Sequence, residues 1–345
     1  MDRSEVKVRY MPYKFIDLFA GIGGIRLGFE STKKCQCVFS SEWDKNAQKT
    51  YEANHGKIDA GDITKVDPND ILDFDILTGG FPCQPFSSIG KRQGFEHPTQ
   101  GTLFFYIKNI LAVKKPKAFL LENVPGLVNH DKGNTLNTIR EVLRCELGYT
   151  TDFMVLNSAD FGVPQYRKRL YIVGFRKDLS IFVNGMDAQS GLCDSINKRK
   201  SDGIVYDFPK GKFVGRHVGF GQFVEKDAEG PSISEHLQKS YIFKKNDGHP
   251  EIVDENFNTP VKTLCASYHK IQRITGTFVK GGKTGLRLLT ENECKYIMGF
   301  DEKTIGRNFI IPVSRTSMYH QFGNSVAVPV IMALAKNIVK TLDAC

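Results

Sequence analysis

KFIDLFAGIGG (Lys14–Gly24) is the stretch that decides the fold. Its first six residues, Lys14–Phe19, are mostly apolar and predict a buried strand. The glycines that follow predict a tight turn, and a helix begins near Ile25. Such a turn lets the backbone approach a ligand closely at the start of a helix. The pattern is not G-x-G-x-x-G, so it does not specifically indicate a dinucleotide pyrophosphate.

Strands and helices alternate after this turn. Further strand candidates, all rich in apolar residues, lie at 36–41, 74–78, 118–121, 149–156 and 170–175. Helices are predicted near 45–54 and 102–113. This alternation predicts an α/β fold with a doubly wound, mostly parallel sheet. Ligands gather at the carboxyl ends of parallel strands, and four residues lie at the ends of predicted strands or shortly after them: Phe19, Glu42, Cys83 and Glu122.

The chain changes in texture after residue 182. Glycines, lysines and polar turns replace the alternation, and helical periodicity returns only in the last segment. With 345 residues, 41% of them hydrophobic, the chain is long enough for one large and one smaller domain. We therefore predict a large domain from 1–182 and 310–345, and a smaller, irregular, strand-rich domain with a hinge over 183–309.

Charge and composition narrow the partners and the compartment. The net charge of +9 favours a polyanion, nucleic acid above all. No apolar stretch reaches the roughly 18 residues of a membrane span, and the N-terminus lacks a signal-peptide core; we expect a cytoplasmic protein and no membrane. The eight cysteines include no C-x-x-C pair, which predicts free thiols and no metal site.

Cys83 lies between two prolines in GGFPCQPFS (Gly79–Ser87). Each proline fixes its own φ and biases the residue before it toward extended geometry. The thiol is therefore expected on a stiff loop just past a strand, presented to a crevice. The alternative, a small apolar residue in a loop, is the commoner role of an isolated Pro-Cys, and the rest of the chain argues against it.

Acidic and aromatic residues at other strand ends suit a nucleotide. Glu42 lies about 20 residues after the glycine turn, where a carboxylate accepts hydrogen bonds from ribose hydroxyls. Trp43, the only tryptophan, could stack on an adenine ring. Asp62 could accept a hydrogen bond from an adenine amino group. The alternatives are a surface acid and a core tryptophan.

Two further groups suit proton transfer and anion binding. Glu122 ends another strand, and a carboxyl partly withdrawn from water has a raised pKa and can donate a proton. Arg167 and Arg169 alternate in QYRKR (Gln165–Arg169) and so point to one side. Two guanidiniums beside a thiol favour the thiolate. The alternatives are a helix-capping acid and a solvated edge strand.

Eight short motifs follow one another along the chain. They are FIDLFAGIGG (Phe15–Gly24), EWD (Glu42–Asp44), GDI (Gly61–Ile63), GGFPCQPFS (Gly79–Ser87), ENV (Glu122–Val124), QYRKR (Gln165–Arg169), RLLTENECKYIMGF (Arg287–Phe300) and QFGNSVAVPV (Gln321–Val330). In this order they resemble the DNA (cytosine-5)-methyltransferases, bacterial enzymes that often belong to restriction–modification systems. The resemblance covers about 14–182 and 286–340.

The resemblance implies the Rossmann-like fold of S-adenosylmethionine-dependent methyltransferases, with the methyl donor in the glycine turn and no metal. Glu42 would hold the ribose, and Asn324 and Ser325 would reach the donor from the C-terminal segment. The implied cofactor-binding residues are Phe19, Gly21, Gly23, Glu42, Trp43, Asp62, Ile63, Asn324 and Ser325.

The same resemblance implies the chemistry. A cytosine flipped out of the duplex would be attacked at C6 by Cys83, while Glu122 protonates or hydrogen-bonds N3. Arg167 and Arg169 would raise the thiolate fraction or hold O2 of the base and a nearby phosphate. A base must then remove the C5 proton; the sequence does not name it, and water is one candidate.

Residues 183–309 would be the target recognition domain, with double-stranded DNA between the lobes. The implied DNA contacts are Ser87, Lys91, Arg92, Thr263 and Arg273. We expect a monomer, and a cognate restriction endonuclease in the same system without direct binding. The rival interpretations are a tRNA cytosine-5 methyltransferase and a catalytically idle DNA-binding paralogue; a nicotinamide dehydrogenase would need the missing glycine motif.

Overall fold

A six-stranded sheet forms the centre of the protein. The computed structural model describes residues 11–81, 103–186, 203–226, 228 and 230–345. The strand order is β2-β1-β3-β4-β6-β5. The strands are β1 (Tyr13–Leu18), β2 (Cys35–Ser41), β3 (Ile76–Gly80), β4 (Ala118–Asn123), β5 (Tyr149–Asn157) and β6 (Lys168–Arg176). All six were predicted, and their ends shift by no more than two residues.

One strand breaks the parallel pattern. β2, β1, β3 and β4 are parallel, whereas β6 is antiparallel to both of its neighbours, β4 and β5. The α/β class and the mostly parallel sheet are confirmed. β6 is the exception, because β5 and β6 are joined without a crossover helix and can pair as neighbours only in opposite directions.

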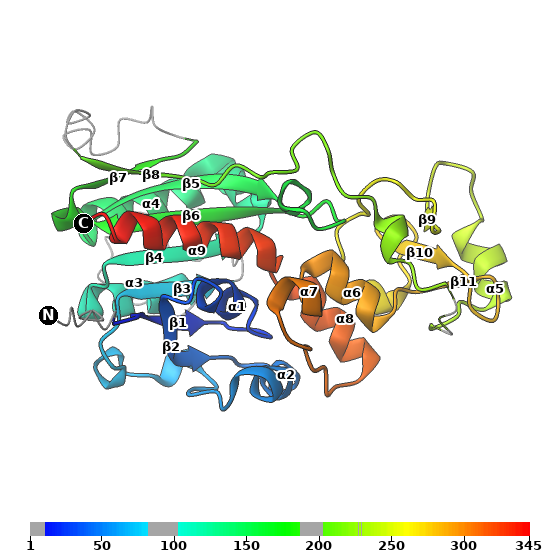
Figure 1. Cartoon of the computed structure of the whole chain (residues 1–345), viewed down its shortest axis with the longest axis horizontal. Coiled ribbons are helices and arrows are strands. Elements are labelled where there is room, and N and C mark those ends of the chain that lie inside the picture. The colour runs from blue at the N-terminus through cyan, green and yellow to red at the C-terminus, as the bar shows by residue number, and fades with distance from the viewer. Residues whose placement is uncertain (1–10, 82–102, 187–202, 227, 229) are drawn as a thin grey trace, which may run out of the picture.

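Helices cover both faces of this sheet (Figure 1). They are α1 (Gly24–Glu30), α2 (Lys45–His55), α3 (Leu103–Lys114), α4 (Asn134–Glu141) and α9 (Val328–Leu342). Side chains alternate along a strand, so Phe15 packs with α1 and α9 while Ile16 packs with α3 and α4 on the opposite face. This double burial explains why the strands read as continuous apolar runs.

A second apolar core lies at the end of the molecule away from both termini (Figure 1). It includes β9 (Glu251–Val253), β10 (Thr277–Lys280), β11 (Leu286–Arg287), α5 (Glu235–Leu237), α6 (Glu291–Met298), α7 (Glu302–Ile305) and α8 (Arg315–Asn324). Ile22 and Leu27 of the large domain join the same cluster. The two cores therefore meet beside the glycine turn.

The packing moves both expected domain boundaries. β7 (Ile181–Asn184) and β8 (Ile204–Asp207) pair with each other, and Ile181 and Tyr206 lie in the core beneath α9. Residues just after 182 thus belong with the large sheet. Conversely Met318 and Phe322 of α8, which were assigned to the large domain, pack into the second core.

The apolar C-terminal segment and one cysteine bear on what composition predicted. The segment Arg315–Leu342, made of α8 and α9, is long and apolar enough to cross a membrane, but 61% of its most apolar window is buried inside the fold. It is a core segment, which matches its packing on the sheet. The expectation that all thiols are free is wrong for Cys145, which is disulfide-bonded.

Close packing of α1 on α9 yields the first prediction. A Cβ at Gly28 would lie 2.3 Å from Ile331 Cγ2 and 3.0 Å from the backbone carbon of Ile331, so a rotamer change cannot relieve the contact. Gly28→Ala should lower the free energy of unfolding by about 1–3 kcal/mol, as over-packing does. The check is the urea midpoint. Gly126→Ala is the control, because nothing lies within 4 Å of its Cβ position; equal midpoints for the two variants would contradict the prediction.

Candidate active site

The antiparallel direction of β6 brings an arginine to the carboxyl end of β4. Glu122 pairs with Tyr171 and Asn123 with Leu170, so Arg169 lies just beyond the end of β4. Its Nε lies 3.1 Å from Oε1 of Glu122, and the two side chains are only 16% and 12% exposed. Two residues that the sequence assigned to catalysis, Glu122 and Arg169, therefore form a buried ion pair.

The environment of Glu122 suits a proton donor. Burial raises its pKa, while Arg169 and then Arg167 lower it, and the net result stays above the usual value. Its Oε2 faces β3, because a Cβ at Gly80 would lie 3.1 Å from that oxygen. Glycine thus leaves room for the carboxyl at this strand end.

The strand end also leads toward Cys83. Asn123 Nδ2 donates a 2.9 Å hydrogen bond to the carbonyl of Phe81, two residues before the cysteine. This bond fixes the start of the Pro-Cys segment beside Glu122. Cys83 itself lies outside the described residues, as do the predicted DNA contacts Ser87, Lys91 and Arg92.

The glycine turn and Glu42 form one unit. The N–H of Gly21 donates to Oε2 of Glu42 at 2.7 Å, and the N–H of Asp44 donates to Oε1 at 2.7 Å. Burial raises the pKa of Glu42, and these hydrogen bonds oppose the shift. Phe19, Gly21 and Gly23 all have positive φ, so the backbone turns sharply here.

The other expected cofactor residues lie on either side of this turn. Trp43 is 75% exposed, so the core-tryptophan alternative is wrong. Asp62 accepts hydrogen bonds from Thr64 N at 3.0 Å and from its Oγ1 at 2.7 Å, and the Thr64 hydroxyl lowers the pKa of Asp62. Ile63, next in the chain, is buried.

The C-terminal segment reaches the turn through Ser325. A Cβ at Gly24 would lie 3.0 Å from Ser325 Oγ, so this serine packs against the start of α1. Asn324 is exposed, with its Nδ2 3.3 Å from Nε2 of His320. Two segments more than 300 residues apart in the chain therefore share one rim.

The two residues of the second domain that were expected to contact DNA, Thr263 and Arg273, lie in different surroundings. Thr263 Oγ1 donates a 2.5 Å hydrogen bond to the carbonyl of Tyr166, beside the arginine motif. Arg273 is 8% exposed and buried in its own domain. Its guanidinium bonds Ile242 O, Lys245 O, His249 O and both carboxylate oxygens of Asp247. Most of its donors are thus taken within its own domain, which argues against the predicted contact between Arg273 and DNA.

Sequence reasoning missed two buried polar residues. Asp17 is fully buried in β1, its Oδ1 lies 3.1 Å from Thr78 Oγ1, and burial raises its pKa to about 7. Gln165 accepts from Leu264 N at 2.7 Å and donates to Ile297 O at 2.7 Å, joining β6 to the second domain. A charged residue inside an apolar strand was the one available signal for Asp17.

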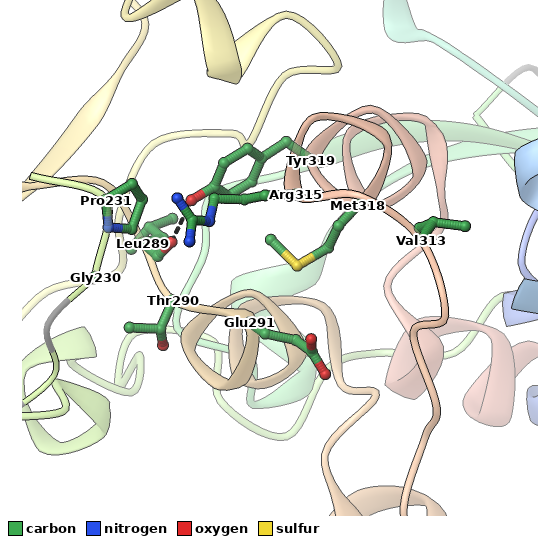
Figure 2. A pocket seen from close by; sticks show the side chains of 9 residues that line it. All are labelled: Gly230, Pro231, Leu289, Thr290, Glu291, Val313, Arg315, Met318 and Tyr319. Atoms are coloured by element: carbon green, nitrogen blue, oxygen red, sulfur yellow. Dashed lines mark hydrogen bonds between the residues drawn. The ribbon is translucent and has the colours of Figure 1, made fainter.

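A pocket of about 240 Å³ lies away from these strand ends, between the starts of α6 and α8 (Figure 2). It is lined by Gly230, Pro231, Leu289, Thr290, Glu291, Val313, Arg315, Met318 and Tyr319. Tyr319 donates a 2.5 Å hydrogen bond to the carbonyl of Leu289 across it. None of the predicted site residues lines this pocket.

Comparison with known proteins identifies the chain. Residues 13–340 match the family described as C-5 cytosine-specific DNA methylase. The chain belongs to this family. It is 52% identical over 94% of its length to Type II methyltransferase M.MspI of a Moraxella species, covering 70% of that protein. It is also 52% identical to Type II methyltransferase M.BsuFI of Bacillus subtilis, over 96% of this chain and 73% of that protein.

Solved structures confirm the fold. A DNMT2 mutant from Spodoptera frugiperda has a TM-score of 0.71 at 22% identity, covering 95% of this chain and 99% of that one. Dnmt2 of S. pombe has a TM-score of 0.69 at 20% identity, covering 96% and 99%. The C-5 methylase described here therefore has the Rossmann-like fold that was predicted.

As a C-5 cytosine-specific DNA methylase, the chain transfers a methyl group from S-adenosylmethionine to cytosine in DNA. The residues present fit this methyl donor. At Gly21 nothing lies within 4 Å of a Cβ position, so the cradle is open, and the exposed Trp43 stands beside Glu42. Within the described ranges, no three His, Cys, Asp or Glu side chains cluster as a metal site would require.

Trp43 gives a direct optical test of this cradle. Because it is the only tryptophan, S-adenosylmethionine should change the intrinsic fluorescence of the methylase on binding. Glu42→Gln should weaken that binding about tenfold or more, since a hydrogen bond to a charged acceptor contributes about 1.5–3 kcal/mol. Glu52→Gln, an exposed position on α2, is the control. An unchanged affinity in Glu42→Gln would refute the ribose-binding role.

Proposed function

We propose that the methylase acts on a cytosine flipped out of a short, specific duplex DNA sequence, through a transient bond between Cys83 Sγ and C6 of the base. The supporting observation is the buried Glu122–Arg169 pair at the end of β4, 3.1 Å apart and tied through Asn123 to the segment that leads to Cys83. Flipping is needed because a stacked base is out of reach of these groups, and it costs a few kcal/mol.

The chemistry follows from the weakness of cytosine C5 as a nucleophile. Attack of a thiolate at C6 moves electrons onto C5 and N3, and a proton donated to N3 removes the charge that develops there. Glu122 is the donor in this proposal, because burial raises its pKa above the usual value and so favours the protonated form. S-adenosylmethionine would supply the methyl group to C5 and leave as S-adenosylhomocysteine. A base, water being one candidate, then takes the C5 proton, N3 returns its proton to Glu122, and Cys83 leaves as the thiolate.

Arg169 acts on the base through Glu122. A free cysteine is only a few per cent thiolate at pH 7, and a guanidinium near the reacting atoms favours the anion. Arg169 holds Oε1 of Glu122, which leaves Oε2 toward β3 and the arriving base. In this proposal Arg169 also steadies O2 of the cytosine.

We also propose contacts with the methyl donor and with DNA. Around the methyl donor we place Phe19, Gly21, Gly23, Glu42, Trp43, Asp62, Ile63, Asn324 and Ser325. On the DNA we place Ser87, Lys91, Arg92 and Thr263. The second domain reads the target sequence. We further propose a monomer in the bacterial cytoplasm, with a restriction endonuclease of the same system that does not bind it directly.

Sequence similarity and the geometry of the site favour a DNA methylase over the two rival interpretations. Relatives at 52% identity are named Type II methyltransferases, which favours duplex DNA over tRNA. The buried Glu122–Arg169 pair favours an active enzyme over an idle DNA-binding paralogue. Bisulfite sequencing of DNA from a host that expresses the protein tests the substrate, and unmethylated cytosines throughout would overturn the proposal.

Cys83→Ala should abolish methyl transfer and should no longer be trapped on duplex DNA that carries 5-fluorocytosine at the target position. Binding of S-adenosylmethionine should stay within about threefold of the parent, because the thiol is not part of the glycine turn. Gel shift under denaturing conditions measures the trapped adduct. Cys345→Ala, at an exposed free thiol, is the control; turnover by Cys83→Ala within tenfold of the parent would sink the assignment.

The raised pKa of Glu122 predicts a pH profile. The rate should rise with pH while a larger fraction of Cys83 is thiolate, and fall once Glu122 loses the proton it must donate. Glu122→Gln should lack the alkaline fall and react about 10²–10⁴-fold more slowly. Single-turnover rates across pH measure this, with Glu141→Gln as an exposed control. A Glu122→Gln profile parallel to the parent's would contradict the proton-donor role.

A further inference from the structure

We infer that Arg167 is a positioning residue that couples the cofactor side of the active site to the DNA side, and does not itself contact the cytosine. The inference rests on the proposed function, in which Ser325 lies beside the methyl donor and Thr263 beside the DNA. Sequence reasoning grouped Arg167 with Arg169, but the two guanidiniums have different partners.

The guanidinium of Arg167 joins two distant segments. The residue is 1% exposed. Nη1 donates to the carbonyl of Leu264 at 3.0 Å, and Nη2 donates to the carbonyls of Gly323 at 2.8 Å and Ser325 at 2.5 Å. One planar group with a fixed fork of donors thus holds the second domain and the C-terminal segment together.

The base of the same side chain is also fixed. The N–H of Arg167 lies 3.1 Å from Asn157 Oδ1 and 3.2 Å from Ser158 Oγ, both at the end of β5. The sheet therefore anchors the arginine, and the arginine anchors the two segments. If either segment moves, the guanidinium must move with it, and this strains its hydrogen bonds to the other segment.

Both segments carry proposed ligand contacts. Leu264 follows Thr263, which is itself bonded to Tyr166 O, and Leu264 N donates to Gln165 Oε1. Ser325 packs against Gly24 at the glycine turn. The guanidinium of Arg167 thus links Ser325, which packs at the methyl-donor cradle, to Leu264, which follows the threonine proposed to face DNA.

Burial of this charge argues for function. Among the residues that the structure describes, no carboxylate hydrogen-bonds to Arg167 and its Nε is buried without a hydrogen-bond partner. An unsatisfied buried donor costs about 1–3 kcal/mol. Burial, and then Arg169, lower the pKa of Arg167. An apolar residue would avoid these costs but could not bridge three carbonyls.

The test measures coupling between the two ligands. S-adenosylmethionine affinity is compared with and without a short duplex carrying the site mapped by bisulfite sequencing, in the parent, Arg167→Lys and Arg144→Lys. Arg144 is the matched control, because its guanidinium also bonds a backbone carbonyl, that of Thr151, away from the strand ends. Binding coupling does not require turnover, so S-adenosylhomocysteine can replace the methyl donor.

In the parent and in Arg144→Lys, DNA should tighten cofactor binding by about fivefold or more, a usual allosteric coupling. In Arg167→Lys the ratio should fall to within about twofold of one, because an ammonium cannot span the three carbonyls. An uncoupled parent, or an Arg167→Lys variant that keeps its coupling, would overturn the inference. Intact coupling without any methylation would instead count against the proposed function.

A second measurement covers the case in which Arg167→Lys does not fold. Hydrogen exchange on the parent protein should show that S-adenosylmethionine alone slows exchange of amides in 261–268, where Leu264 N bonds Gln165. The methyl donor does not touch this segment in the proposed site; Arg167, together with the direct packing of Gly323 against Ala266, links the segment to the cofactor side. Unchanged exchange there would overturn the inference.

Discussion

Glu122 and Arg169 meet because β6 runs antiparallel to β4, with Glu122 opposite Tyr171 and Asn123 opposite Leu170. In a wholly parallel sheet the first residues of β6 would lie at the opposite edge from the last residues of β4. The reversed strand therefore delivers the QYRKR motif to the edge where β1, β2 and β3 lead into the glycine turn, Glu42 and Phe81. The remainder of the proposed site assembles around that placement.

The same placement sets the electrostatics. A carboxyl withdrawn from water strongly prefers its neutral form, and a nearby guanidinium opposes that preference. Glu122 lies between these influences, with burial the larger one and Arg169 and Arg167 the compensating charges. The balance keeps the carboxyl ready to give up a proton without leaving it as an unpaired buried anion. Arg167 meanwhile directs its Nη donors to backbone carbonyls, whereas Arg169 contacts Glu122 directly, so the two arginines of one motif have different partners.

Much of this could be predicted from the sequence. Strands such as β1 and β4 are buried on both faces, so apolar runs identify them, and the residues that follow them fall at one edge by topology alone. The direction of β6 could not be predicted, because apolar periodicity carries no information on strand polarity. Burial of Arg167 and Arg273 was missed because their partners, most of them backbone carbonyls, are distant in sequence. The packing of Phe322 could not be predicted for a similar reason, because it enters the second core through tertiary contacts.

The proposed mechanism requires Glu122 and Arg169 to act as one unit. A double-mutant cycle on single-turnover methyl transfer, with Glu122→Gln, Arg169→Gln and both together at saturating S-adenosylmethionine and DNA, measures this directly. If the pair is a unit, the double variant should be about as slow as the slower single variant, since either change already breaks the contact. Rate losses that simply multiply would mean that the two side chains work independently and would contradict the account.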